Sequence, residues 1–288
     1  MEPLFPPFEP GDREAKPVRH RRLRRVPLRV ILPNLVTLLA LCSGLTAIRL
    51  AVELRFELAV VAILVAGVLD GLDGRVARLL KGTSRFGAEL DSLADFVNFG
   101  VAPAIMLYTW ILKEAGSLGW IAALVFAIST ALRLARFNVM LDEPDKPAWH
   151  ADFFVGMPAP AGALTVLLPL YLYFLGLLPE SIALIPPVIG YVLFVAFMMV
   201  SRLPTFSGKR IGSRVSREHV LPIFVAVVVI VAVVVSYPLP SLALVIVGYL
   251  ATLPVSWRMW HRKNAETAAA GAGTSAADDD EDEEIDEP

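Results

Sequence analysis

Long apolar runs dominate this 288-residue chain and restrict the folds that are open to it. Hydrophobic residues make up 56% of the sequence, whereas soluble domains have roughly 45–50%. The excess is gathered in runs close to the ~20 residues that a helix needs to cross a bilayer. Helix is favoured over strand, because an isolated strand leaves its backbone polar groups unpaired in lipid. We therefore predict an all-α, polytopic membrane helix bundle.

Eight segments are predicted to span the membrane: residues 30–52, 56–80, 91–112, 118–137, 158–178, 181–201, 219–237 and 241–257. They divide the chain into a basic arm (residues 1–29), a transmembrane domain (residues 30–257) and an acidic tail (residues 258–288). The tail is predicted to be disordered, because its composition cannot bury apolar surface. The arm either lies on anionic lipid headgroups or serves only as a topology signal.

Lys and Arg are concentrated in the connections that lie on one side of the membrane if the chain starts in the cytoplasm. Because positive residues favour the inner side, both termini are predicted to be cytoplasmic, in the cell membrane. The lone cysteine, Cys42, excludes an intramolecular disulfide and is interpreted as a packing residue.

Four aspartates stand at the predicted cytoplasmic end of two neighbouring apolar segments. On a helix, Asp70 and Asp73 share one face, and Asp91 and Asp95 share a face of the next helix. A short turn joins the two helices, so their acidic faces are expected to oppose each other near the cytoplasmic surface. Ionisable groups in a membrane segment are costly and indicate function. Four convergent carboxylates suit one or two hard cations such as Mg²⁺, Mn²⁺ or Ca²⁺, and the lack of His and Cys argues against zinc.

Small residues and an arginine accompany the acidic faces. Gly74, Ala77 and Gly87 remove side-chain bulk along the same groove, so a phosphorylated ligand can approach the backbone. Arg78 carries a planar guanidinium that suits phosphate. Cations on a diphosphate, together with a carboxylate that takes a proton from an alcohol, would perform phosphoryl transfer. The residues alone therefore predict phosphoryl transfer at the membrane surface.

Two other interpretations of the aspartates remain open. They could form interhelical ion pairs with the nearby arginines, although buried pairs are weak stabilisers. They could also line an ion pathway, as in a divalent-cation transporter. Against a pathway, the acids gather near one face, and the second half of the chain has no matching set.

The spacing Asp70-x2-Asp73-Gly74-x2-Ala77-Arg78-x8-Gly87-x3-Asp91-x3-Asp95 resembles the signature of the CDP-alcohol phosphotransferases at all eight fixed positions. Members of that family are membrane enzymes that move a phosphatidyl-type group from a CDP-linked lipid to an alcohol and release CMP. Residues 33–37, 91–103, 133–138, 153–160 and 204–209 resemble its phosphatidylserine synthase branch. Ser92 and Phe96 stand where the phosphatidylglycerophosphate synthase branch has Pro and Lys. The resemblance covers about residues 30–255.

The resemblance implies a dimer of six-helix cores, to which this branch adds two helices. It implies CDP-diacylglycerol and L-serine as substrates in the lipid bilayer and no nucleic-acid partner. The same chemistry would also operate with a different acceptor alcohol, such as inositol phosphate or glycerol phosphate, or with an archaeal ether lipid as the donor. The implied cofactor is a divalent metal, Mg²⁺ or Mn²⁺, as two ions. The implied ligands are Asp70, Asp73, Asp91 and Asp95, with Asp95 also the general base, and the implied CDP pocket comprises Asn34, Thr37, Asp73, Gly74, Ala77, Arg78 and Gly87.

Basic residues beyond the aspartates are candidates for binding serine or a lipid phosphate. Arg133 and Arg136 are three residues apart on one predicted helix face, with Asn138 close behind them. They could instead be ordinary positive-inside arginines. Lys209 and Arg210 are candidates for the donor's diphosphate, and the alternative for them is a solvated basic loop.

Overall fold

The computed structural model describes residues 28–82, 84–141, 153–179, 181–201 and 204–206, and, further on, residues 222, 224–225, 228–229, 232–234 and 236–253. In chain order its elements are α1 (Leu28–Val52), α2 (Phe56–Leu79), α3 (Arg85–Asp95), the π-helical η1 (Phe96–Val101), α4 (Ala102–Trp110), the 3-10 helix η2 (Leu112–Ala115), α5 (Ser117–Leu141), β1 (Phe153–Val155), α6 (Ala159–Val166), α7 (Leu168–Phe174), the 3-10 helix η4 (Ile182–Leu184), α8 (Ile185–Val200) and β2 (Pro204–Phe206). A further apolar helix runs over Pro238–Leu253.

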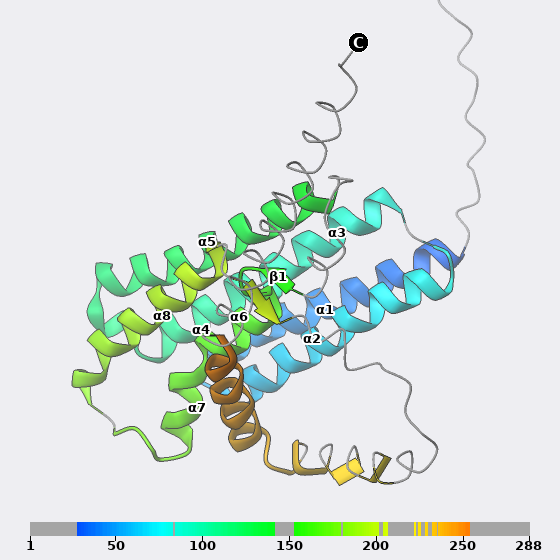
Figure 1. The fold of residues 1–288 in the computed structure, drawn as a ribbon. Helices are drawn as coiled ribbons and strands as arrows, with labels where there is room; N and C mark the ends of the chain where they lie inside the picture. The colour runs from blue at the N-terminus through cyan, green and yellow to red at the C-terminus, as the bar shows by residue number, and fades with distance from the viewer. Residues whose placement is uncertain are drawn as a thin grey trace, which may run out of the picture.

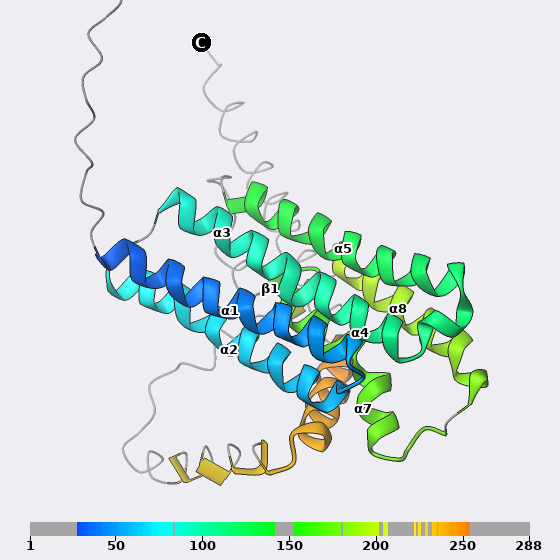
Figure 2. The ribbon, with the colours of Figure 1, turned by 180° about the vertical axis from the view of Figure 1, so that it is seen from behind.

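Long helices lying side by side form the body of the molecule (Figure 1). α3, η1 and α4 continue into one another as a single helix over Arg85–Trp110. α1 packs against both α2 and this composite helix, as the view from behind shows (Figure 2). α5 packs against α8 and against the composite helix. The first three long helices therefore surround the aspartates, and α5 closes the bundle beside them.

Local sequence signals explain the turn that brings α2 and α3 together. Lys81 adopts a left-handed φ of 49°, which ends the helical path after α2. Ser84 then caps α3, because its Oγ accepts a hydrogen bond of 3.0 Å from the backbone N–H of Gly87. The composite helix therefore begins at Arg85, six residues before the start of the predicted membrane span at residue 91.

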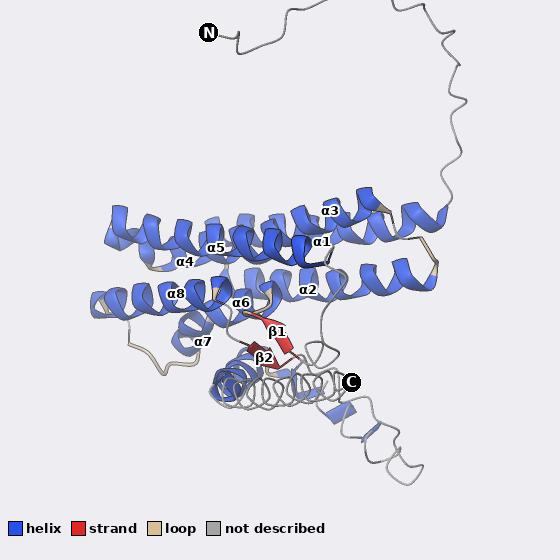
Figure 3. Ribbon diagram, turned by 45° about the horizontal axis from the view of Figure 1, so that its top comes forward, coloured by secondary structure: helices blue, strands red, loops and turns tan. Residues whose placement is uncertain are grey.

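The all-α expectation is confirmed. In the described part of the chain the only strands are β1 and β2, which pair antiparallel with Phe153 opposite Phe206 (Figure 3). The predicted segment 158–178 contains two helices, α6 and α7, which meet at Leu167. Pro169 explains this break, because it lacks the N–H that would continue the helical ladder.

Four described helices are long and apolar enough to cross a membrane: Ile31–Val52, Arg85–Trp110, Ser117–Met140 and Ile182–Val200. Their outer faces carry exposed apolar side chains such as Leu45, Ile128 and Phe197, as lipid contact requires. α2 occupies the second predicted span, and the Pro238–Leu253 helix covers most of the eighth. The seventh, residues 219–237, lies largely outside the described residues, as do the basic arm and the acidic tail. The number of eight spans stays a prediction.

Candidate active site

Three of the four aspartates come together between α2 and α3. Asp70 of α2 and Asp91 and Asp95 of α3 each place a carboxylate oxygen within 4.8 Å of the other two. The spacing of four residues puts Asp91 and Asp95 on successive turns of one helix face. The turn between α2 and α3 folds that face back onto α2. The opposed acidic faces expected from the sequence are therefore present for these three residues.

The fourth aspartate, Asp73, has a protein partner. Thr37 of α1 donates a hydrogen bond of 2.7 Å from its Oγ1 to Asp73 Oδ2, and Asp73 is buried. Asp73 still interacts electrostatically with Asp70 and Asp91. All four carboxylates therefore share one electrostatic environment, in which α1 orients the fourth.

The three gathered carboxylates fit a divalent metal site. One buried oxygen of Asp91 and one of Asp95 have no hydrogen-bond partner among the described residues. A buried carboxylate oxygen without a hydrogen-bond partner is costly, so such an arrangement indicates a cation. The donors are all oxygen, which suits Mg²⁺ or Mn²⁺.

Several of the implied nucleotide-binding residues lie next to the carboxylates. A Cβ at Gly87 would lie 2.8 Å from Asn34 Oδ1, so the absence of a side chain there permits the close approach of α1. At Gly74 nothing lies within 4 Å of a Cβ position, which leaves the adjoining surface open. Ala77 is half-buried and Arg78 exposed on the last turn of α2. These positions occupy the part of the site nearest the α2–α3 turn.

Arg133 and Arg136 have different surroundings. Arg133 interacts electrostatically with Asp95, and its guanidinium carbon lies 5.4 Å from the centre of the Phe137 ring. Arg136 instead donates from Nη1 to the carbonyl of Val200 at 2.6 Å, at the end of α8. Arg133 therefore adjoins the acidic cluster, while Arg136 ties α5 to α8.

The other predicted polar contacts lie elsewhere. Asn138 donates from Nδ2 to Ser92 Oγ at 2.9 Å and so connects α5 to α3. Lys209 and Arg210 lie outside the described residues.

Two residues without a sequence-derived role lie close to the cluster. Asn98 of η1 is fully buried three residues after Asp95. Tyr249, on the Pro238–Leu253 helix, interacts electrostatically with Arg133. A carboxamide inside an apolar membrane segment is the signal that could have identified Asn98. Tyr249 has no comparable signal, since tyrosine is common in membrane helices near their ends.

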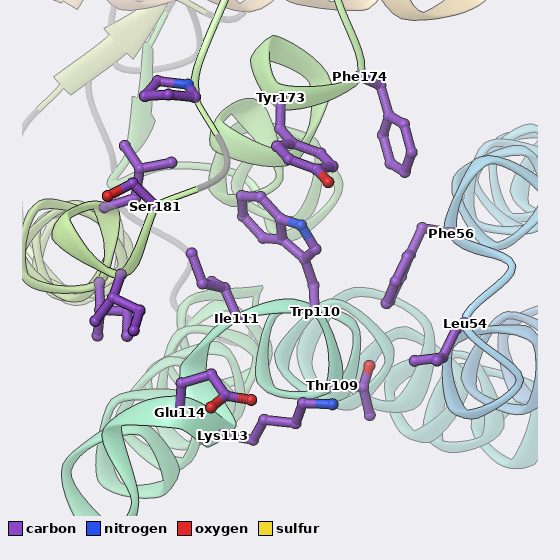
Figure 4. Close-up of a pocket in the computed structure, with 14 residues that line it drawn as sticks. Leu54, Phe56, Thr109, Trp110, Ile111, Lys113, Glu114, Tyr173, Phe174 and Ser181 are labelled. Carbon is purple, nitrogen blue, oxygen red and sulfur yellow. The ribbon is translucent and has the colours of Figure 1, made fainter. Parts of the chain in front are cut away.

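A cavity of about 500 Å³ lies at the opposite end of the bundle (Figure 4). Its lining includes Phe56 after the α1–α2 turn, Trp110 at the end of α4, and Tyr173 of α7. The Trp110 and Tyr173 rings lie 5.4 Å apart. None of the four aspartates lines this cavity, so it is separate from the candidate active site.

Residues 30–201 match the family model described as CDP-alcohol phosphatidyltransferase, and residues 218–254 match the one described as CDP-alcohol phosphatidyltransferase 2. The chain is similar to the CDP-diacylglycerol–serine O-phosphatidyltransferase of Mycobacterium leprae (strain TN), at 44% identity over 82% of this chain and 77% of the relative. It is 33% identical to the protein of the same name from Helicobacter pylori (strain J99), over 79% of this chain and 91% of the relative. The Mycobacterium tuberculosis (strain H37Rv) protein of that name is 52% identical over 48% of each chain.

Proposed function

The chain belongs to the CDP-alcohol phosphotransferase family, and from this membership we propose that it transfers the phosphatidyl group of CDP-diacylglycerol to L-serine and releases CMP. The family model covers residues 30–201, which contain all four aspartates. The observation that carries the choice of serine is the 44% identity to a relative named for this reaction, over 82% of the chain. The family and the long apolar helices make the chain an integral membrane protein.

The aspartates are proposed to bind the metal, and the glycines to admit the nucleotide. Asp70, Asp91 and Asp95 would ligate the ions, and Asp73, held by Thr37, would complete the set. A bound Mg²⁺ or Mn²⁺ pair supplies polarisation of the phosphoryl oxygens and neutralises charge on the departing phosphate. The CDP moiety would lie over Gly74, Ala77 and Arg78, where the surface at Gly74 is open, with Gly87 and Asn34 beside it.

Asp95 is proposed as the general base. Its carboxylate takes the proton of the serine hydroxyl while the serine oxygen forms a bond to the phosphatidyl phosphorus. The bond from that phosphorus to the CMP oxygen breaks, and its electron pair leaves with CMP. Arg133, which already interacts with Asp95, would bind the serine carboxylate. Arg136 is committed to the Val200 carbonyl and would act through the position of α5.

The site is proposed to face the cytoplasm, in the cell membrane, with both termini on that side. The Lys and Arg distribution supports this orientation. A homodimer is also proposed. Ala123, Ala127, Ala131 and Ala135 recur every four residues along α5 and line an apolar groove of about 450 Å³ beside α4. Faces of small residues allow membrane helices to pack closely, so this groove offers a contact for a second copy.

The test is CMP release by the purified protein in detergent, with CDP-diacylglycerol, Mn²⁺ or Mg²⁺, and one alcohol at a time. We expect serine to support release, and glycerol 3-phosphate and inositol phosphate not to. Asp95→Asn should lower turnover by about 10²- to 10⁴-fold, because the variant cannot accept the proton, while CDP-diacylglycerol still binds.

Glu89→Gln is the matched control, since it removes an exposed carboxylate from the same helix outside the cluster. It should keep full turnover. Release with another alcohol only would assign the chain to a different branch. Cation flux across vesicle membranes, without CMP release for any alcohol, would show that the protein is a transporter and not this enzyme.

A further inference from the structure

Asn98 is a buried polar side chain without a protein partner. It is 0% exposed, and neither its Oδ1 nor its Nδ2 has a hydrogen-bond partner in the part of the chain that the structure describes. A buried amide left unpaired is destabilising, so such groups in folded proteins are few and call for a reason. Asn98 therefore does not contribute to the fold through hydrogen bonding to described residues.

The surrounding backbone is shaped to accommodate this side chain. Asn98 lies in η1, a π-helical segment, and such segments are frequent at functional sites. Across from it, α1 has Gly44, where a Cβ would overlap Asn98 Oδ1. Gly44 and Thr37 are seven residues apart and so share one face of α1. The helix face that orients Asp73 through Thr37 therefore also leaves space for Asn98.

The position of Asn98 relative to the aspartates indicates which substrate it would meet. Asp91, Asp95 and Asn98 follow one another at spacings of four and three residues, away from the α2–α3 turn. The positions proposed for CDP lie on the other side of the carboxylates, toward that turn. In an in-line transfer the entering and leaving oxygens lie on opposite sides of the phosphorus. The acceptor alcohol must therefore enter on the side of Asp95 and Asn98.

We propose that Asn98 is a specificity-determining residue that binds the acceptor amino acid beside Asp95, and this inference rests on the proposed function. A carboxamide offers one acceptor oxygen and two N–H donors. Its Oδ1 can accept from the ammonium of serine, and its Nδ2 can donate to the serine carboxylate. An acceptor without these groups, such as glycerol 3-phosphate, would leave the amide unpaired, which penalises the wrong alcohol.

The test uses Asn98→Leu, which keeps the branched shape and removes both hydrogen-bonding atoms. Serine-dependent CMP release is measured at saturating CDP-diacylglycerol, together with CDP-diacylglycerol affinity and thermal unfolding in detergent. We expect the KM for serine to rise about tenfold or more, as for loss of hydrogen bonds to charged groups. CDP-diacylglycerol affinity should not change, and the unfolding temperature without serine should hold or rise.

Tyr171→Phe is the matched control. Tyr171 is also fully buried with a hydroxyl that has no partner among the described residues, but it lies on α7, near the cavity at the opposite end. This variant should keep the KM for serine. If the leucine variant does not fold, Asn98→Ser replaces it in the test, because serine is too small to overfill the space. This variant should also raise the KM for serine.

The outcomes separate the two proposals. A wild-type protein that releases no CMP with serine overturns the proposed function and this inference with it. A wild-type protein that is active, with an Asn98→Leu variant of unchanged serine KM, overturns only the inference. A variant that loses stability and CDP-diacylglycerol affinity together with serine affinity would make Asn98 a packing residue and also overturns the inference.

Discussion

Asp73 differs from the other three aspartates, because a hydroxyl of α1 orients it. The Thr37 hydroxyl lies 2.7 Å from Asp73 Oδ2, and both residues are buried. A hydrogen bond to a charged acceptor fixes the carboxylate orientation before any cation or nucleotide binds. This single bond therefore connects α1 to the proposed chemistry of α2.

Thr37→Val should weaken the metal dependence of the reaction, because it removes this donor and keeps the side-chain shape. The Mn²⁺ concentration for half-maximal CMP release should rise about tenfold, the usual effect of losing a hydrogen bond to a charged group. Thr46→Val is the control on the same helix, since exposed Thr46 only donates to the Cys42 carbonyl of its own turn. Equal metal dependence in all three proteins would show that Thr37 does not orient Asp73.

At the scale of elements, the contact between α1 and η1 sets the position of the whole site. It occurs at Gly44, against Asn98, and α1 approaches α3 again where Asn34 meets Gly87. Both contacts depend on a missing side chain, so α1 can approach the composite helix closely along its length. A change at either glycine moves Thr37 and Asn34 together, because both lie on α1.

Gly44→Ala should destabilise the protein by about 1–3 kcal/mol, because the added methyl group must displace the Asn98 amide. Thermal unfolding in detergent measures this loss, and CMP release should fall with it as α1 shifts. Gly190→Ala is the control, since nothing lies within 4 Å of a Cβ at that position of α8. A Gly44→Ala protein as stable as the control would contradict close packing at this contact.

The sequence predicted most helices well, and the exceptions have local causes. Hydropathy alone placed the start of the third span at residue 91, because residues 85–90 are too polar to count as membrane core. The helix itself begins at Arg85, because Ser84 caps it there. Periodicity predicts neither the break at Leu167, which Pro169 causes because it lacks a backbone N–H, nor the π-helical turn after Asp95. These two features decide where α7 and Asn98 lie.

The acidic cluster was largely predictable, since helical spacing decides which aspartates share a face. The different positions of the basic residues could not be predicted in this way. Arg133 and Arg136 look equivalent in the sequence, since both are arginines on one predicted helix face. In the structure Arg133 interacts with Asp95, whereas Arg136 binds the end of α8. That difference depends on where α8 packs against α5, and the sequence of α5 alone does not reveal this.

At the scale of the whole molecule, repulsion within the acidic cluster lowers the stability of the helix packing that surrounds it. Asp91 interacts with the like charges of Asp70 and Asp73, and the described chain supplies Arg133 as the nearby cation of Asp95. Binding of a divalent cation only to the folded form stabilises it, by about 2.7 kcal/mol at a hundredfold excess over Kd. Folding and metal binding are therefore expected to be coupled.

Chelation with EDTA should lower the unfolding temperature in detergent and abolish CMP release, and Mn²⁺ should restore both. Asp91→Asn should unfold at a higher temperature than the wild type in EDTA, because one repelling charge is gone, and should gain little from Mn²⁺. Glu89→Gln should respond to Mn²⁺ as the wild type does. An unfolding temperature that is independent of Mn²⁺ in the wild type would exclude a metal site that contributes to stability.

The apolar side chains that separate the aspartates have a consequence for kinetics. Leu72 stands between Asp70 and Asp73, Leu93 between Asp91 and Asp95, and both are exposed on the outer surface of the bundle. Polar and lipid-facing positions thus alternate within a single helical turn. A donor that carries acyl chains would reach such a site by lateral diffusion in the bilayer, while serine would arrive from the water. The rate would then follow the mole fraction of the donor among the surrounding lipids, not its amount per volume of solution, so diluting the membrane with inert lipid would slow the enzyme at constant total substrate.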